Sequence, residues 1–310
     1  MKFIKKNLWW LAICGTIILV GLSFRYQPKL LGAYFPALQF LDANSGTVKS
    51  AWFDAEGLRV TAQTYLQALV EGDISGHTPF VKFGRVTGVN ASEVDVIPWT
   101  AAYVFPTTSQ KLLASSTSAN DTALGTGIRT IIIEGLTGTY ATQTETLSLS
   151  GTANVTTTNA FFRINRVRAG SAGSVGSAAG QIYLANITST QRLASIETGQ
   201  TQSRQLVYTV PYNQTLYTVT DRVSCGVGYL AGPNTPKTTY NIFTMRANYD
   251  GTATTTFFLP FSEIGLQSGS VVMPLELPNK YIGTTDIKMS VIGDVANSVS
   301  CQAAIRGWLE

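Results

Sequence analysis

The sequence predicts a mainly β protein with one or two antiparallel β-sandwich, jelly-roll-like domains and a single N-terminal transmembrane helix. Three observations support this prediction. The chain opens with an uncharged apolar run, β-branched and threonine-rich segments then recur between glycines and prolines, and a helical period is confined to one short stretch. With 310 residues, the chain is long enough to bury a substantial core.

The composition is unusually poor in charge. Charged residues make up 13% of the chain, about half the usual quarter, so the surface must consist largely of Thr, Ser, Asn, Gln and Gly. The net charge of +4 is not concentrated in a run beyond the first residues. Because nucleic-acid binding needs clustered Lys and Arg, we expect no nucleic-acid partner.

Residues 1–30 are expected to form a membrane anchor. An uncharged stretch from Asn7 to Phe24 is preceded by lysines and followed by Arg25. As a helix it would span roughly 27 Å, just enough to cross a hydrocarbon core. A cleaved signal peptide is the main alternative, but the run lacks an Ala-x-Ala cleavage site. The anchor positions are Leu8, Trp9, Trp10, Leu11, Ile13, Ile17, Ile18, Leu19, Val20 and Leu22.

Residues 31–86 are expected to be a linker that contains one short helix. The segment "TAQTYLQALVEGD" has apolar residues at helical spacing, with Thr61 as the candidate N-cap. The residues on its apolar side are Tyr65, Leu66, Leu69 and Val70.

Residues 87–198 are expected to form a first β-sandwich. "IRTIIIEGL", from Ile128 to Leu136, is a β-branched run bounded by glycines, and "TETLSLSG" alternates threonine or serine with Leu147 and Leu149. "NAFFRINRVRAG" is a third strand candidate. The segment Ala169–Gly180, "AGSAGSVGSAAG", is either a flexible linker or a mobile surface loop.

Residues 199–310 are expected to form a second, jelly-roll-like β-sandwich. Short strand candidates follow one another at regular spacing, separated by Asn-Gln, Asp-Gly, Ser-Gly and Pro-Asn. Pro260, Pro274 and Pro278 must lie at strand edges or corners, because proline cannot donate to a sheet ladder. A fibronectin-like sandwich suits the pattern nearly as well, since strand order cannot be read from one sequence.

The chain has three cysteines. Cys14 lies in the apolar N-terminal run, so only Cys225 and Cys301 are available for a disulfide in the β-rich part. Two buried free thiols that pack as small hydrophobic groups are the favoured interpretation.

No catalytic, cofactor or metal site is predicted. The single histidine, His77, lies in a Gly/Pro-rich turn and is interpreted as structural or exposed. Four carboxylates are candidates for a paired acid–base site: Asp121, Glu134, Glu145 and Asp221. They could converge in space only by long-range folding, so we interpret them as solvated acids or as acids paired with arginine.

Two polar segments are interpreted as structural. Arg163, Arg166 and Arg168 are expected to be protective charges on a strand edge rather than a base-stacking or phosphate site. Asn120 and Asp121 are expected in a capped turn rather than in a calcium loop, because their spacing is not that of an EF-hand.

The strings "SSTSANDTALGTGIRTIIIEGL" and "ETLSLSGTANVTTTNAFFRINR", with "GHTPFVKFG" upstream, resemble a family of structural proteins in marine bacteriophage genomes. The resemblance covers roughly Leu58–Gln181 and is looser in the C-terminal third. It implies a virion component, head-associated or fibre-like, without catalysis. The N-terminal apolar run is not associated with that family, and it suggests a virion that contains a membrane.

These observations lead to three hypotheses. The first is a non-enzymatic minor capsid, vertex or spike component, located in the virion and in the host membrane during assembly. Its partners would be lipid, other virion proteins and copies of itself in trimers or pentamers. The alternatives are a major capsid protein with a double jelly roll and a cell-surface or receptor-binding adhesin. The adhesin's candidate partner-binding loop contains Tyr229, Asn234, Lys237 and Tyr240.

Overall fold

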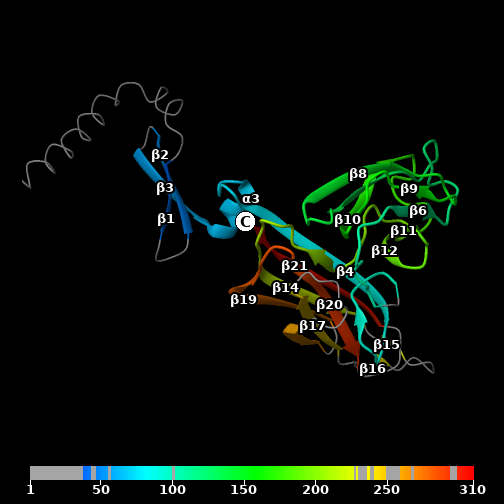
Figure 1. Ribbon diagram of the computed structural model, residues 1–310. Helices are drawn as coiled ribbons and strands as arrows, with labels where there is room; N and C mark the ends of the chain where they lie inside the picture. Colours follow the sequence, from blue (N-terminus) through cyan, green and yellow to red (C-terminus); the bar gives the residue numbers. More distant parts are fainter. Residues whose placement is uncertain are drawn as a thin grey trace, which may run out of the picture. The chain divides into compact units, whose positions relative to one another are not determined.

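The computed structural model describes residues 38–42, 47–54, 57–99, 102–226, 228–229, 236–237, 241–248, 259–266, 269–293 and 299–310. The chain divides into two compact units, Met1–His77 and Thr78–Glu310. Strands dominate both, and every pairing between the described strands is antiparallel (Figure 1). The prediction of a mainly β protein is therefore confirmed.

The first unit contains a three-stranded sheet in the order β1-β2-β3, where only a linker was expected. Its strands are β1 (Leu38–Asp42), β2 (Thr47–Asp54) and β3 (Gly57–Thr64). β2 and β3 pair along their whole length, from Asp54 opposite Gly57 to Thr47 opposite Thr64. The hairpin was missed because the two residues between these strands, Ala55 and Glu56, carry no turn signal.

The predicted short helix is present as α3 (Tyr65–Glu71). Thr61 is not its cap, because it lies inside β3. Ala68 and Leu69 are buried, whereas Leu66 and Val70 are 48% and 72% exposed. The expected apolar side is therefore wrong for Leu66 and Val70, since seven residues make only two turns and α3 buries just one short stretch.

The second unit consists of two modules, each built from two sheets (Figure 1). The C-terminal module contains β4 (Thr78–Val89), β5 (Val94–Asp95), β13 (Val207–Thr209), β14 (Leu216–Cys225), β17 (Asn241–Asn248), β18 (Leu259–Leu266), β19 (Gly269–Tyr281), β20 (Asp286–Gly293) and β21 (Val299–Leu309). The inserted module contains β6 (Leu112–Ser116), β7 (Ile128–Leu136), β8 (Thr142–Ser148), β9 (Val155–Thr156), β10 (Arg163–Ala172), β11 (Ile182–Asn186) and β12 (Arg192–Ile196).

The C-terminal module has its hydrophobic core between a four-stranded and a five-stranded sheet. The first sheet has the order β19-β14-β21-β4, and the second has the order β13-β20-β17-β18, with β5 also paired to β20. Val223 and Ile305 from the first sheet share the core with Phe243 and Met289 from the second. Along β4 and β21, buried residues alternate with more exposed ones over most of each strand, as the two-residue period of a strand requires. A small pair, β15 (Gly228–Tyr229) with β16 (Pro236–Lys237), forms a separate ladder.

The inserted module interrupts one strand of the C-terminal module. β5 and β13 both pair with β20, at neighbouring positions. Val96 donates to the carbonyl of Met289, and Leu206 donates to the carbonyl of Val96 at 2.9 Å. The chain therefore leaves the sheet after Val96 and returns to the same place at Leu206. Gly84 of β4 makes room for this junction, because a Cβ there would lie 2.5 Å from the Val96 carbonyl oxygen.

The inserted module packs β10-β7-β8 and β12-β11-β6-β9 around a second core. β7 has the bounds predicted for its β-branched run, and β8 shows the predicted alternation. Ile131 and Ile133 of β7 are fully buried, and Leu147 packs against the same core. The threonine-rich stretch is thus a folded β segment, as predicted.

The predicted domain boundaries at residues 87 and 199 differ from the observed arrangement. The first boundary cuts through β4, and β4 and β5 belong with strands that follow the inserted module. A discontinuous module has no signature in a linear pattern, because strand pairing over more than 100 residues is decided by tertiary packing.

The prolines of the C-terminal module occupy edge strands, as predicted. Pro260 lies in β18, and Pro274 and Pro278 lie in β19, each strand ending its sheet. An edge strand tolerates proline because one row of its backbone groups has no ladder partner.

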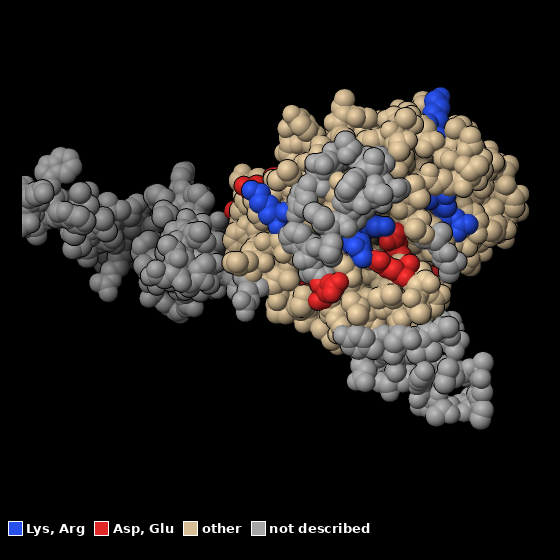
Figure 2. Space-filling view, turned by 60° about the horizontal axis from the view of Figure 1, so that its bottom comes forward, with Lys and Arg blue, Asp and Glu red and all other residues tan. Residues whose placement is uncertain are grey.

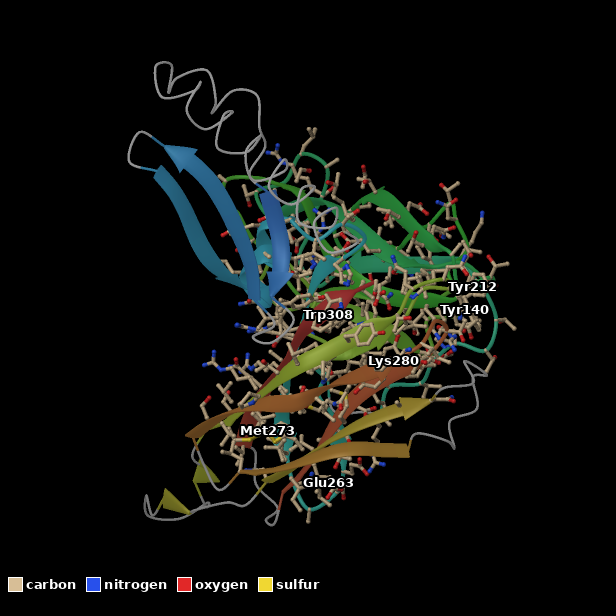
Figure 3. All side chains as sticks on the ribbon, turned by 90° about the vertical axis from the view of Figure 1, so that its left-hand side faces the viewer. Tyr140, Tyr212, Glu263, Met273, Lys280 and Trp308 are labelled. Atoms are coloured by element: carbon tan, nitrogen blue, oxygen red, sulfur yellow. A yellow bond between two sulfur atoms is a disulfide. The ribbon has the colours of Figure 1, made fainter. Side chains whose placement is uncertain are left out.

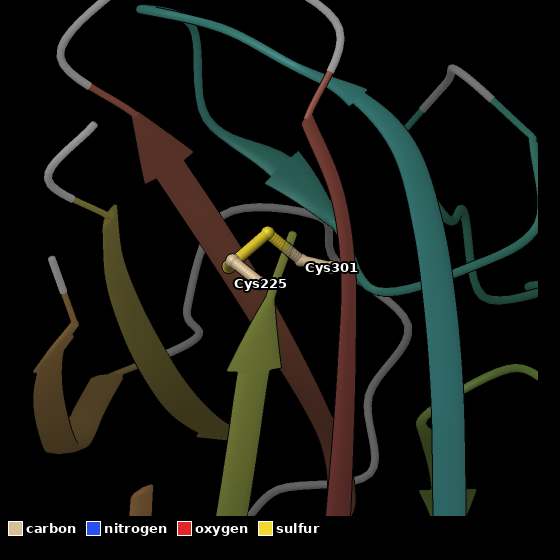
Figure 4. The surroundings of a disulfide bond; sticks show 2 residues. All are labelled: Cys225 and Cys301. Atoms are coloured by element: carbon tan, nitrogen blue, oxygen red, sulfur yellow. A yellow bond between two sulfur atoms is a disulfide. The ribbon is translucent and has the colours of Figure 1, made fainter. Parts of the chain in front are cut away.

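Cys225 and Cys301 form a disulfide between β14 and β21 (Figure 4). The two residues face each other in the strand register, with their Cα atoms 4.2 Å apart. The expectation of two free thiols is therefore wrong. Their separation of 76 residues gave no indication of this pairing.

The predicted membrane anchor, residues 1–30, lies outside the described residues. Among the residues that the structure describes, no helix is both long enough and apolar enough to span a bilayer.

Candidate functional site

The two modules meet along β10, which lies beside the end strand β13 of the C-terminal module. The side-chain amide of Asn165 donates to the Thr209 carbonyl at 2.9 Å and accepts from the Thr209 N–H at 2.8 Å. One side chain thus satisfies both backbone groups of a residue on a strand that ends its sheet. The contact covers part of an edge that could otherwise pair with another chain.

Arg163 and Asp286 form a buried ion pair at this junction. Nε of Arg163 donates to Oδ1 of Asp286 at 2.9 Å, and Nη2 donates to Oδ2 at 2.8 Å. The two side chains are 0% and 1% exposed. Nη1 donates to the carbonyl of Pro106, and the guanidinium lies 4.0 Å from the ring centroid of Phe162. The bidentate geometry fixes the orientation of β10 relative to β20.

Burial and pairing act against each other on the Asp286 carboxyl. Burial raises its pKa above the ordinary value, while Arg163 and the Thr209 hydroxyl, which both donate to the carboxylate, oppose that rise. A carboxylate buried to this degree is stable as an ion only while its partner is present. Arg163 therefore offsets the cost of burying the Asp286 carboxylate at the junction between the modules.

Lys82 of β4 contributes a third polar contact at the junction. It is 8% exposed, and its Nζ donates to the backbone carbonyl of Asn165. Burial lowers the pKa of Lys82 to about 7, and the nearby positive charge of Arg166 lowers it further, against the opposing effect of Glu134. Near neutral pH this amine is therefore poised between its charged and neutral forms.

Further contacts link the modules. Glu197, which follows β12, binds both Arg85 of β4 and Arg204. The Tyr212 N–H donates to the carbonyl of Tyr140, which lies in the turn between β7 and β8, and the two tyrosines lie near each other in Figure 3. An apolar cluster formed by the segment after β5 and by β13 completes the junction: Ile97, Tyr103, Phe105 and Val207, with Trp99 packed against it. The modules are therefore held as one body by polar and apolar contacts together.

The segment "SANDTALGTG" is organised by Asp121, which is fully buried. Its carboxylate accepts hydrogen bonds from the Ser116 hydroxyl and from the N–H groups of Ile128, Ala179 and Gly180, at 2.6 to 3.0 Å. Four donors occupy the carboxylate, so its role is to join two loops, which agrees with the predicted capped turn.

The glycine-rich segment 169–180 is neither a linker nor a loosely attached loop. Its first residues belong to β10, and Gly173 donates to the carbonyl of Gly127. Ala178 donates to the carbonyl of Gln200, and Gly180 donates to Asp121. Its small residues allow close approach, since a Cβ at Gly173 would lie 2.3 Å from the Gly125 carbonyl oxygen. The segment is thus a packed part of the inserted module.

The other candidate carboxylates do not gather into a site. Glu134 pairs with Arg168 at 2.7 Å, and Glu145 accepts from the backbone N–H groups of Thr158 and Asn159. Glu145 faces Ile133 across the β7–β8 ladder, so it lies on the opposite face from Glu134. Asp221 is buried in β14, in the other module. Within the described residues, no group of three or more His, Cys, Asp or Glu could hold a metal ion.

His77 lies in the turn after α3. Its Nδ1 is 3.1 Å from the Ser75 carbonyl oxygen, and its ring meets the ring of Tyr65 edge-on with the centroids 6.3 Å apart. These are local contacts of a turn residue.

The three arginines of β10 differ in role. Arg166 binds Gln202, and Arg168 pairs with Glu134, as expected for charges on the outer strand of a sheet. Arg163 is the exception, because it is buried and pairs with Asp286. Its aromatic neighbours in "AFFRINR" were a signal of burial, but its partner lies 123 residues away.

The candidate partner-binding loop is described only in part. Tyr229 belongs to β15 and Lys237 to β16, and the two strands pair antiparallel. Asn234 and Tyr240 lie outside the described residues.

No protein-family model and no curated protein matches this chain. The geometry described above is therefore the basis for assigning a function.

Proposed function

We propose that the chain is a structural protein of a bacteriophage virion, a minor capsid, vertex or spike component tied to lipid by residues 1–30. Its partners would be other virion proteins and copies of itself. The observation that supports this best is the strand order of the C-terminal module.

That order is the order of a jelly-roll sandwich. With its strands numbered one to eight along the chain, and with β5 and β13 counted together as the second, the two sheets read 1-8-3-6 and 2-7-4-5. This alternation between facing sheets is the jelly-roll arrangement, which is common in viral capsid proteins. A fold alone does not define a function, so the surface and the junction have to agree with it.

The surface and the junction between the two modules both favour a role in assembly. On the face in Figure 2, residues other than Lys, Arg, Asp and Glu cover most of the described surface. Surfaces with few charges are readily covered by neighbouring subunits. The buried Arg163–Asp286 pair and the Asn165–Thr209 contact hold two modules as one block, which suits a protein that is a building unit.

The inserted module favours a minor component over the major capsid protein with a double jelly roll. Numbered along the chain, its seven strands read 7-6-1-4 and 5-2-3. This differs from the order of the C-terminal module, whereas a double jelly roll needs the same order twice.

Counting the copies of this chain in purified particles, before and after detergent extracts lipid, tests the proposal. A few tens of copies released with the lipid are expected for an anchored vertex or spike component. Many hundreds of copies that stay in an intact shell would identify a major capsid protein instead. Absence from particles, with the chain present on whole cells, would favour the adhesin.

A further inference from the structure

The outer face of the sheet β19-β14-β21-β4 carries a basic hollow. Val223, Cys225 and Ile305 point into the core, so the alternate residues Arg222, Ser224 and those opposite them point outward. In the register, Arg222 faces Val272 and Ala304, and Ser224 faces Ser270 and Gln302. Figure 3 shows β19, β14 and β21 side by side, with Lys280 and Trp308 labelled on this sheet.

The hollow has a volume of about 230 Å³. Small side chains form part of its lining, and larger polar, basic and aromatic side chains complete it. These include Phe83, Arg85, Arg204, Arg222, Ser224 and Gln302. A space of this size fits one ring of a small molecule, since drug-sized ligands need roughly 300 Å³ or more.

Among the described residues, positive charge exceeds negative charge around the hollow. Glu197 pairs with Arg85 and Arg204, so one carboxylate is shared by two of the three guanidiniums that line the hollow. Arg222 is exposed and has no ion-pair partner among the described residues. Arg306 and Lys280, both exposed, lie further along the same face. Glu310 follows β21 at the opposite end of the sheet from the hollow.

We propose that this hollow binds an acidic saccharide through its carboxylate. Arg222 would bind the carboxylate, because guanidinium and carboxylate match in a two-point geometry. The Gln302 amide and the Ser224 hydroxyl would bind ring hydroxyls. The ring of Phe83 would pack against the apolar face of the sugar.

The recessed geometry favours a saccharide over the other anionic polymers. Arg85 and Arg204 have side chains only 32% and 20% exposed and are held down by Glu197. A flat bilayer surface would reach the exposed Arg222 but not these two cations, whereas a projecting sugar carboxylate can enter the hollow beside all three. Single-stranded nucleic acid stacks successive bases on several open aromatic faces, but Phe83 is the one aromatic among the described residues that line the hollow, and Trp308 on this face is 8% exposed and stacks on Tyr217.

The experiment uses the full-length chain in non-ionic detergent and isothermal titration calorimetry. The probes are tetragalacturonate, neutral maltotetraose, glycerophosphoglycerol as a lipid headgroup, and a 12-nucleotide single-stranded DNA. We expect tetragalacturonate to bind, and we expect its affinity to fall as the salt concentration rises. Arg222→Gln should weaken binding about tenfold, and Gln302→Glu, which adds a carboxylate to the hollow, should abolish it.

Lys111→Gln is the matched control, because it removes one exposed charge in the inserted module. It should change the affinity by less than about twofold. Arg222 and Gln302 are exposed, so both variants should keep the wild-type unfolding midpoint. Three results would each overturn the site. Maltotetraose could bind as tightly as tetragalacturonate, Lys111→Gln could lose as much affinity as Arg222→Gln, or tetragalacturonate could fail to bind. Binding of the headgroup or the DNA alone, sensitive to Arg222→Gln, would overturn the saccharide assignment.

Discussion

Arg163 and Asp286 form a two-point ion pair across 123 residues of sequence, with both side chains shielded from solvent. One partner lies in β10 of the inserted module and the other begins β20 of the C-terminal module. The pair therefore joins two hydrophobic cores that form from separate parts of the chain. Its loss should affect the contact between the modules more than either core.

Arg163→Met should destabilise the second unit by about 3–5 kcal/mol, because it leaves the Asp286 carboxylate buried without its cation. Urea unfolding of the full-length chain, followed by tryptophan fluorescence, measures this loss. The double variant Arg163→Met with Asp286→Leu removes both charges and should recover much of the stability.

Arg168→Met is the control for this change, since the Arg168–Glu134 pair has side chains 40% and 32% exposed. It should cost less than about 1 kcal/mol. Equal losses for Arg163→Met and Arg168→Met would contradict the role given to the buried pair.

The local elements of the inserted module could be predicted from the sequence, because their signals are short-range. The β-branched run of β7 and the alternation of β8 report directly which face of a strand is buried. The edge positions of Pro274 and Pro278 follow from the missing N–H of proline.

The connections between distant segments could not be predicted. The interruption between β5 and β13, the Cys225–Cys301 register and the partner of Arg163 each depend on which strands pair over long distances. One sequence carries no information on such pairing, so each domain was predicted as one continuous segment of the chain. The basic hollow was missed for the same reason, because its arginines come from separate segments of the chain.

Asp121→Asn should destabilise the inserted module by about 2–3 kcal/mol, because an amide cannot accept from all four donors that the carboxylate now binds. Hydrogen exchange should quicken in residues 116–128 and 173–181 and remain unchanged in β20 and β21. Asn120→Ala, at an exposed neighbouring position, should leave both stability and exchange unchanged. Equal exchange in wild type and Asp121→Asn would refute the organising role of this carboxylate.

The Cys225–Cys301 bond should be detectable by thiol counting. In denaturant without reductant, iodoacetamide should label one cysteine, Cys14, and after reduction it should label all three. Three labels without reductant would show that the bond is absent. Because the bond closes a segment of 76 residues, Cys225→Ser with Cys301→Ser should cost about 2–4 kcal/mol.

Lys82 should make the stability of the second unit depend on pH. Its pKa is lowered to about 7 in the folded chain from an ordinary value of 10.5, so between these values the unfolded chain binds more protons. The free energy of unfolding therefore rises with pH above about 7 as Lys82 loses its proton in the folded chain. Below that pH, the full cost of burying the charged amine is present.

Lys82→Met removes the buried cation while keeping the length of the side chain, so it should stabilise the second unit most in acid. The gain over wild type should shrink by about 2–3 kcal/mol between pH 6 and pH 9, as the wild-type amine loses its proton in the folded state. Urea unfolding of both proteins at each pH measures the difference. Lys111→Met, at an exposed position, provides the control and should show a difference that does not vary with pH. A constant gain for Lys82→Met would show that the amine titrates normally and that the junction does not bury its charge.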